Sequence, residues 1–159
     1  MHRRLVDLLV LAGAVAAGVG AVALSWPQAP ALSPQRASWT LTPGVANPDV
    51  TERTLADTIC KSGWTRTIRP PSDYTGELKL EQMKAYGRRG RPWDYQEDHL
   101  ISLELGGHPT DPRNLWPEPI DRAEEVDQVE NELNDAVCSG RMTLEEAQRR
   151  ESALKHTAG

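Results

Sequence analysis

An almost unbroken apolar stretch at residues 5–25 divides this chain into a targeting segment and the part that folds. It follows a basic start with Arg3 and Arg4, and residues 29–31 have the small-residue form of a cleavage site. These are the parts of an export signal. About 20 apolar residues also suffice to cross a bilayer, so an uncleaved anchor is the alternative. We therefore expect residues 1–31 to be a signal peptide or a membrane anchor. The rest of the chain is then secreted or extracytoplasmic, free or anchored through residues 5–25.

The rest of the chain is long enough for one compact domain. Residues 32–48 are rich in proline and predict an extended linker, which leaves residues 49–159 for the domain. Over the whole chain 26% of the residues are charged and 38% are hydrophobic, which excludes complete disorder and a protein with many membrane spans. In an oxidising compartment Cys60 and Cys138 are expected to form a disulfide, with two buried free thiols as the alternative.

Hydrophobic spacing and capping patterns indicate an α+β fold that is mostly helical outside a short β-hairpin. Apolar residues three and four apart follow one face of residues 121–137, and Thr143 with Glu146 forms a capping box that opens a last helix. The expected elements are helices at 50–59, 73–86, 121–137 and 143–156, an extended segment at 63–69, and a hairpin-like unit with its first strand at 99–105.

The most informative stretch reads EDHLISLELGG, from Glu97 to Gly107, and is followed by Asn-Leu-Trp at residues 114–116. It resembles the HNH, or ββα-metal, nucleases, in which an Asp-His pair, a short apolar strand, Gly-Gly and Asn-Leu precede a helix. Asn114 lies 15 residues after His99, as in colicin-type members. The resemblance covers residues 97–130. It implies a small HNH-like ββα-metal core with additional flanking helices, and an endonuclease activity.

The resemblance also implies roles for individual residues. His99 would be the general base that deprotonates water, since an imidazole with a pKa of about 6.5 is neutral at pH 7. The Asp position of the family, here Asp98, is a metal ligand, and a carboxylate ligand favours Mg²⁺, with Mn²⁺, Ni²⁺ or Zn²⁺ as alternatives. Asn114 would fix the loop that orients His99 or complete the site.

One part of the family pattern is missing, because the helix expected after Asn114 carries no histidine. The matching positions are Ala123 and Asp127, and only Asp127 has a side chain that binds metal. We therefore expect Asp127 to be the second metal ligand. Its rivals are Glu118, Glu124 and Glu130. The alternative is a solvated acidic helix face without a function.

The formal net charge of −5 averages two opposed segments. Residues 53–91 contain nine Lys and Arg against four Asp and Glu, whereas residues 92–135 contain thirteen Asp and Glu against two Arg. A basic segment suits a phosphate backbone, and a divalent cation would offset part of the acidic excess. The expected phosphate contacts are Arg88, Arg89 and Arg91, with Arg66 and Arg69 behind them, and Arg113 next to Asn114.

The sequence thus predicts an exported, metal-dependent endonuclease that cleaves DNA, with RNA as a second substrate. Its specificity is expected to be low, because no sequence-reading helix is evident. An inactive HNH-like binding module at the cell surface is one alternative, and a structural domain with an accidental Asp-His pair is another. Nucleic acid is the expected partner, a membrane only through the N-terminal segment, and no small-molecule cofactor is evident.

Overall fold

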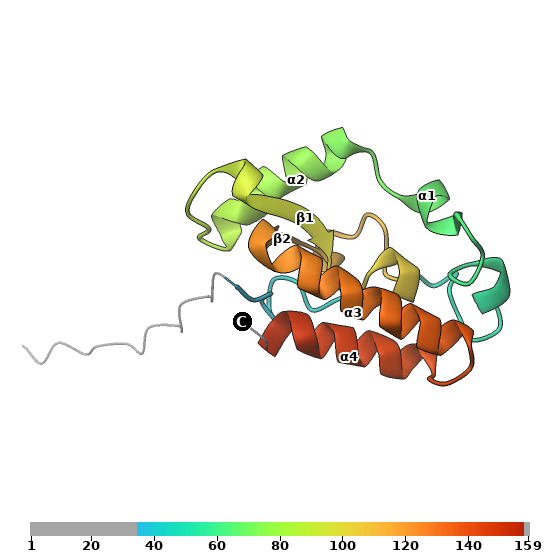
Figure 1. Ribbon diagram of the computed structural model, residues 1–159. Coiled ribbons are helices and arrows are strands. Elements are labelled where there is room, and N and C mark those ends of the chain that lie inside the picture. Colours follow the sequence, from blue (N-terminus) through green and yellow to red (C-terminus); the bar gives the residue numbers. More distant parts are fainter. Residues whose placement is uncertain (1–34, 158–159) are drawn as a thin grey trace, which may run out of the picture. The chain divides into compact units, whose positions relative to one another are not determined.

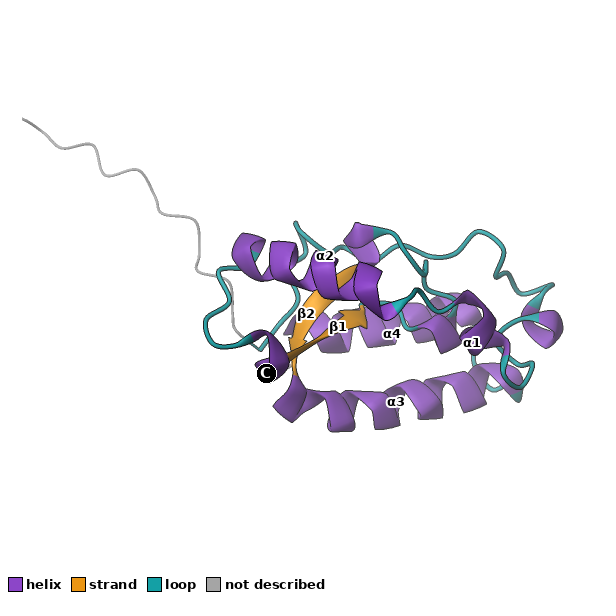
Figure 2. Ribbon diagram, turned by 90° about the horizontal axis from the view of Figure 1, so that it is seen from above, coloured by secondary structure: helices purple, strands orange, loops and turns teal. Residues whose placement is uncertain are grey.

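The computed structural model describes residues 35–157 and shows an α+β fold built around a two-stranded antiparallel hairpin (Figure 1). Figure 1 shows the hairpin between helices that lie on its two sides, and the view from above shows the helix of residues 72–85 crossing over the strands (Figure 2). The strands are β1 (Tyr95–His99) and β2 (Leu115–Pro119), and the helices are α1 (Trp64–Ile68), α2 (Ser72–Ala85), α3 (Ile120–Cys138) and α4 (Leu144–Thr157). Helix α2 covers one side of the hairpin, and α3 with α4 covers the other. The signal or anchor expected at residues 1–31 lies outside the described residues.

The hairpin pairs its strands in a register that sets Asp98 opposite Trp116. The prediction of a strand at residues 99–105 is wrong, because β1 ends at His99 and residues 103–105 form a 3₁₀ turn. The residues that follow β1 are buried one after another rather than alternately. Uninterrupted burial over so short a run suits a loop folded into the core better than a strand with one solvent face.

Two glycines turn this loop back on itself. Gly106 has a φ of +74°, in the left-handed region, and a Cβ there would lie 2.6 Å from Cγ1 of Val50. A Cβ on Gly107 would lie 1.7 Å from the carbonyl oxygen of Ile101. Only residues without side chains permit this approach, which keeps the loop close to the end of β1.

Three of the predicted helices are confirmed as α2, α3 and α4, with only small differences at their ends. The apolar face of α3 buries Val126, Leu133 and Val137. Its buried face also contains the charged residue Glu130, and that of α4 contains Glu151 and Lys155. Charged side chains therefore enter the interior from both helices.

Residues 50–59 do not form the predicted helix and contain only a 3₁₀ turn at Leu55–Asp57. Threonine hydroxyls in this segment bond to backbone carbonyls: Thr54 donates to Asp49 at 2.8 Å, and Thr58 donates to the carbonyl of Thr54 at 2.7 Å. Local bonds of this kind offer the backbone an alternative to the helix. The segment is therefore held by its threonines rather than by a helical ladder.

The extended segment predicted at residues 63–69 is instead the short helix α1. Gly63 precedes it with a φ of 79°, and the hydroxyl of Thr67 donates to the carbonyl of Trp64 at 2.6 Å. Among residues 35–157 the hairpin is the only sheet, so the β-branched residues here have no strand to pair with. The chain leaves α1 at Arg69.

Residues 35–48, which belong to the predicted linker, lack a regular helix but pack against the domain. Thr42 is fully buried. The N–H of Ala37 donates to the carbonyl of Lys155 at 2.9 Å, and the N–H of Asn47 donates to that of Gly106 at 2.8 Å. This part of the segment is therefore a structural element that joins α4 to the glycine turn.

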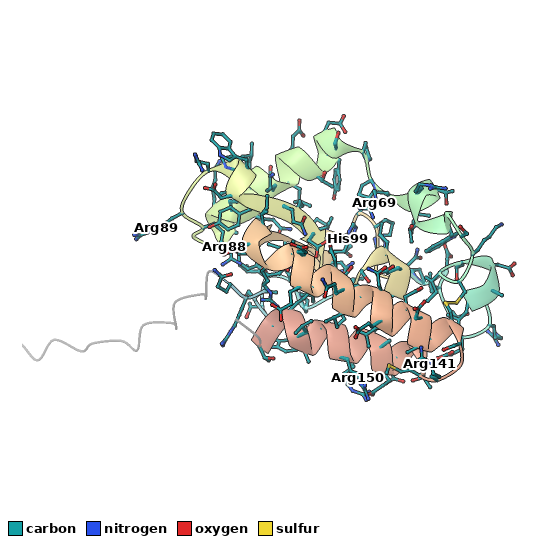
Figure 3. All side chains as sticks on the ribbon, in the orientation of Figure 1. Arg69, Arg88, Arg89, His99, Arg141 and Arg150 are labelled. Atoms are coloured by element: carbon teal, nitrogen blue, oxygen red, sulfur yellow. A yellow bond between two sulfur atoms is a disulfide. The ribbon has the colours of Figure 1, made fainter. Side chains whose placement is uncertain are left out.

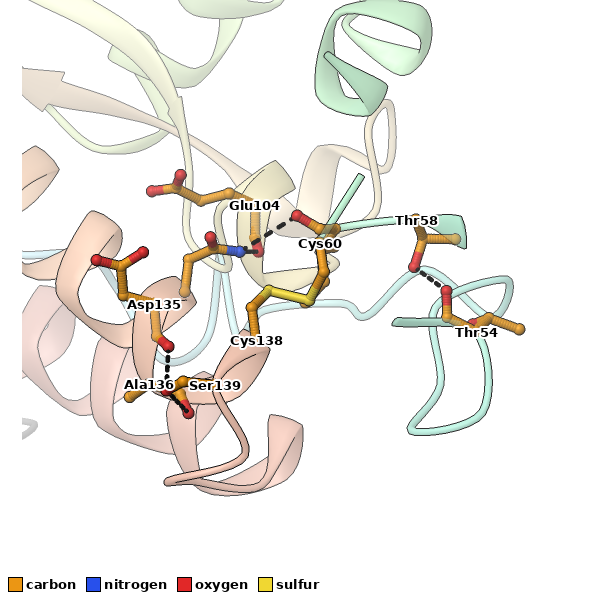
Figure 4. The surroundings of a disulfide bond; sticks show 10 residues. Thr54, Thr58, Cys60, Glu104, Asp135, Ala136, Cys138 and Ser139 are labelled. Carbon is orange, nitrogen blue, oxygen red and sulfur yellow. Dashed lines mark hydrogen bonds between the residues drawn. A yellow bond between two sulfur atoms is a disulfide. The ribbon is translucent and has the colours of Figure 1, made fainter. Parts of the chain in front are cut away.

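The predicted disulfide between Cys60 and Cys138 is confirmed (Figure 4). The two Cα atoms are 5.5 Å apart and the sequence separation is 78. Chain-entropy models give a loop of this size about 4 kcal/mol of stabilisation. Beside the disulfide, Asn134 of α3 donates to the carbonyl of Glu104 at 2.6 Å. The C-terminal part of α3 thus holds both the segment before α1 and the loop after β1.

Candidate functional site

A polar cleft of about 250 Å³ lies at the end of β1, between that strand, α3 and the chain that leaves α1. Its ionisable lining residues are Arg69, Asp98, His99, Glu104, Asp127 and Glu130. Figure 3 shows Arg69 near His99, although the two come from different elements. Four carboxyl groups face one guanidinium, so the cleft is acidic. It brings together three of the predicted site residues, Asp98, His99 and Asp127.

His99 is the last residue of β1 and is only 5% exposed. Its Nε2 lies 3.0 Å from the carbonyl oxygen of Pro109. A carbonyl oxygen only accepts hydrogen bonds, so Nε2 carries the proton and Nδ1 keeps its lone pair. Burial lowers the pKa of His99 and outweighs the opposite effects of the Pro109 bond and the charge of Asp98. The imidazole is therefore neutral at pH 7, with Nδ1 able to accept a proton.

Asn114 is fully buried and uses its side chain to hold the loop after β1. Its Oδ1 accepts from the N–H of Ile101 at 3.0 Å and from that of Val45 at 3.2 Å. Its Nδ2 donates to the carbonyls of Ile101 and His108, both at 3.0 Å. Pro109, whose carbonyl bonds to the imidazole, directly follows this anchored loop. Asn114 therefore acts on His99 through the backbone and does not touch the cleft.

Lys155 lies beneath the site, and no pattern in the sequence points to it. Its ammonium donates to Asp98 Oδ2 at 2.8 Å, to the main-chain carbonyl of His99 at 2.5 Å and to Glu130 Oε1 at 2.6 Å. Burial lowers the pKa of Lys155, but Asp98, Glu151 and Glu130 outweigh burial and hold it well above its usual value. Glu151 and Lys155 are four residues apart, a spacing that is typical of ion pairs on an exposed helix face. The sequence therefore gives no sign that this pair is buried.

The two predicted metal ligands face the same cleft in different states. Burial would raise the pKa of Asp98, but the ammonium of Lys155 holds it below its usual value. Burial and the charge of Asp98 together raise the pKa of Asp127. The carboxylates therefore repel one another across the cleft, and the ammonium of Lys155 offsets part of this repulsion, most directly at Asp98, to which it is bonded.

The rival ligands occupy three different places. Glu130 lines the cleft and bonds to Lys155. Glu118 is fully buried in β2 and accepts from Gln96 Nε2 at 3.1 Å, whereas Glu124 is exposed on α3. Within residues 35–157, no three Asp, Glu, His or Cys side chains meet as a group that would hold a metal ion by protein ligands alone.

Of the six expected phosphate contacts, only Arg69 lines the cleft, and Arg88, Arg89, Arg91, Arg113 and Arg66 do not. Arg88 stacks on Tyr86 and Trp116, with its guanidinium carbon 4.8 Å and 5.6 Å from the ring centres. Figure 3 places Arg88 and Arg89 at the other end of β1 from His99. Two more of them pair with neighbouring acids: Arg91 with Asp94 at 3.0 Å, and Arg113 with Asp111 at 2.6 Å. Arg69 is the guanidinium that the fold brings to the cleft instead.

Comparison with known proteins found no matching family model, no similar curated protein and no similar solved structure. A search for membrane spans across residues 35–157 found no helix of sufficient length and apolarity. The assignment of a function therefore depends on the geometry of the cleft.

Proposed function

We propose that this chain is an exported endonuclease that hydrolyses phosphodiester bonds of DNA, and of RNA as a second substrate, with low sequence specificity. The observation that carries the proposal is the neutral imidazole of His99, which lines a polar cleft together with the guanidinium of Arg69. Phosphodiester hydrolysis needs a base for the attacking water and a cation for the phosphate. His99 would supply the base, and Arg69 would supply part of the positive charge, the rest coming from a divalent ion.

His99 would accept the proton of the attacking water at Nδ1, because Nε2 is bonded to the carbonyl of Pro109. General-base catalysis of this kind contributes about 10²–10⁴-fold to the rate. Arg69 would hold a non-bridging phosphate oxygen through its guanidinium donors. Asn114 keeps the ring of His99 in place by holding the loop that ends at Pro109.

The oxygen donors of the cleft fit a divalent cation. Mg²⁺ commonly binds through one or two carboxylates and keeps water and substrate phosphates as its other ligands, so a group of three protein ligands is not required. Asp98 and Asp127 would hold it, with Mn²⁺, Ni²⁺ and Zn²⁺ as alternatives. Bound there, the ion supplies positive charge to the phosphate and the leaving oxygen. It would also reduce the repulsion between an acidic cleft and an anionic backbone.

The order of the elements and the disulfide support the finer parts of the proposal. Strands β1 and β2 followed directly by α3 would be the HNH-like ββα core. The disulfide between Cys60 and Cys138 favours an oxidising compartment and therefore export. Phosphate contacts carry no sequence information, which is why low specificity is expected.

A second candidate is an inactive HNH-like binding module at the cell surface. The contacts of Lys155 favour it, because the ammonium already pairs with Asp98 and Glu130. A divalent ion would compete with this internal cation for the same carboxylates. If the cleft bound no ion, the chain would bind nucleic acid but would not hydrolyse it.

Plasmid cleavage by the disulfide-bonded chain separates these candidates. Nicked and linear products are expected with Mg²⁺, none with a chelator, and a loss of about 10²–10⁴-fold in His99→Ala. His99→Ala also controls for contaminating nucleases, and Arg141→Ala, at an exposed residue away from His99 in Figure 3, should cleave like the wild type. Absence of cleavage with Mg²⁺, Mn²⁺, Ni²⁺ and Zn²⁺ would reject the nuclease. Retained DNA binding in that case would support the binding module.

A further inference from the structure

Lys155 has no role in the function proposed above, although its ammonium contacts both residues of the Asp-His pair. Nζ donates to the carboxylate of Asp98 and to the main-chain carbonyl of His99. The side chain is 0% exposed, so it does not touch a substrate in the cleft. Any effect of Lys155 on the chemistry must pass through the residues that it holds.

A second contact from α4 reaches the backbone just beyond β1. The two carboxylate oxygens of Glu151 each lie 3.0 Å from the main-chain nitrogen of Ser102. Lys155 and Glu151 are one helical turn apart, and Nζ lies 3.2 Å from Glu151 Oε1. The pair therefore fastens α4 to the chain on both sides of Leu100, at His99 and at Ser102.

Stability is a weak reason for a lysine at this position. Taking an ammonium and its carboxylates out of water costs several kcal/mol per ion, and apolar side chains of similar volume are often at least as stabilising. The arrangement does fix directions in space, because the three protons of the ammonium point to three oxygens, on Asp98, His99 and Glu130. Lys155 therefore fixes the positions of Asp98 and His99 at the end of β1.

We propose that Lys155 is a positioning residue, which holds the Asp98–His99 end of β1 in the geometry that hydrolysis requires. The inference rests on the proposed nuclease function. His99 has two anchors: its ring bonds to the carbonyl of Pro109, and its own carbonyl bonds to Lys155. Loss of the second anchor lets the ring shift relative to the phosphate, and a displacement of about 1 Å costs about 100-fold in rate.

The test compares Lys155→Met with Lys79→Met. Lys79 is a matched control, because its Nζ also donates to a carbonyl of β1, that of Tyr95 at 3.0 Å, at the opposite end of the strand. Lys155→Met is expected to lower kcat about 10- to 100-fold with little change in KM. Lys79→Met is expected to leave both within about twofold. Lys155→Arg keeps the charge and is expected to recover part of the lost kcat.

A double variant shows whether Lys155 acts through His99. In a His99→Ala background, Lys155→Met is expected to cause a much smaller further loss of kcat, because the imidazole is gone and only the contact with Asp98 is left to lose. A folded Lys155→Met protein with the kcat of the wild type, or an equal loss in both backgrounds, would overturn the inference. A wild-type chain that is inactive with every ion tested would overturn the proposed function instead.

A measurement on the unmodified protein covers the case in which Lys155→Met does not fold. The Lys155 ammonium is expected to give a slowly exchanging ¹⁵N NMR signal with a scalar coupling to the carbonyl carbon of His99. Acetylation of the native chain is expected to modify Lys61, Lys79 and Lys84 and to spare Lys155. Acetylation of Lys155 at the rate of the others, with no such coupling, would contradict the contact on which the inference depends.

Discussion

The two ends of β1 carry opposite chemistry, although the strand has only five residues. Basic residues gather near Tyr95, whereas the end at His99 faces an acidic cleft. An extended strand of this length separates its first and last residues by about 13 Å. Nearness in sequence to the Asp-His pair therefore does not bring a guanidinium to the site.

Two of the three guanidiniums near Tyr95 are engaged within the protein itself. Arg88 lies over aromatic rings and donates to the carbonyl of Arg36 at 2.9 Å, and Arg91 pairs with Asp94. In the cleft, by contrast, the described contacts of Arg69 are its charge effects on His99 and Asp127. The contrast shows that a substrate contact needs a cation that the fold leaves available, and a basic run in the sequence does not identify one.

The largest effect is expected from removing the guanidinium of Arg69, the one that the fold leaves available in the cleft. Arg69→Ala is expected to lower kcat/KM about 10- to 100-fold, since a hydrogen bond to a charged group contributes about 1.5–3 kcal/mol. The dependence of nucleic-acid binding on salt should also weaken, by about one unit in the slope of log affinity against log salt. Cleavage kinetics measure the first effect, and binding titrations over a range of salt concentrations measure the second.

Arg66→Ala is the matched control, since Arg66 lies on α1 and is exposed outside the cleft. Equal losses in the two variants would mean that α1 attracts nucleic acid through its general charge. An unchanged Arg69→Ala protein would remove Arg69 from the proposed mechanism.

Asp127→Asn removes one of the negative charges of the acidic cleft. The variant is expected to raise the Mg²⁺ concentration for half-maximal cleavage about 10-fold, because one of two carboxylate ligands is lost and even outer partners of a metal site contribute this much. Asp135→Asn, an exposed change further along α3, is the control and should behave as the wild type. A Mg²⁺ titration that is the same in all three proteins would point to Glu130, the rival ligand that lines the cleft.

The sequence predicted the helices of this fold better than its strands. Helices α2, α3 and α4 have spacing or capping signals that act within one segment, and Cys60 and Cys138 leave only one disulfide to form. Strand β1 reads Tyr-Gln-Glu-Asp-His, and nothing in that composition predicts a strand. Its pairing with the fully buried β2 decides its structure, and that contact is long-range.

The candidate site divides in the same way. Asp98, His99 and Asn114 follow from an ordered motif with a fixed spacing. Lys155 does not, because its burial depends on the carboxylates that α3, α4 and β1 bring together in space. The sequence indicated Arg66 and Arg69 together as phosphate contacts and did not distinguish them. In the structure Arg66 lies on α1, whereas Arg69 follows the end of α1 and lines the cleft.

Glu97 lies midway along β1, between its two ends, and is expected to make the stability of the folded chain depend on pH. Burial, with a smaller effect of the charge of Asp98, raises the pKa of Glu97 to about 8, and neither carboxyl oxygen has a hydrogen-bond partner within the described structure. The folded chain then keeps a proton that the unfolded chain loses near pH 4.5. The stabilisation is complete below that pH and is lost as the pH rises to about 8.

Denaturant unfolding between pH 6.5 and 8 measures this effect. Glu97→Gln is expected to flatten the fall in unfolding free energy with pH by roughly 1 kcal/mol per unit. Glu77→Gln, on an exposed position of α2, should leave the slope as it is in the wild type. A slope that Glu97→Gln does not change would assign the titration to other buried carboxyl groups, those of Glu118 and Glu130, whose pKa values burial raises to about 8 and about 10.

Arg89→Ala is the smallest expected change and the most direct check on the far end of β1. Arg89 is exposed there, away from His99 (Figure 3). Its loss is expected to alter kcat/KM on plasmid by no more than about twofold, as is usual for a surface substitution outside a site. A larger loss that disappears on a substrate too short to reach from the cleft to Tyr95 would show that the backbone follows the full length of β1. In that case the two ends of the strand would be one binding surface, with Arg69 at the scissile phosphate and Arg89 at a distant one.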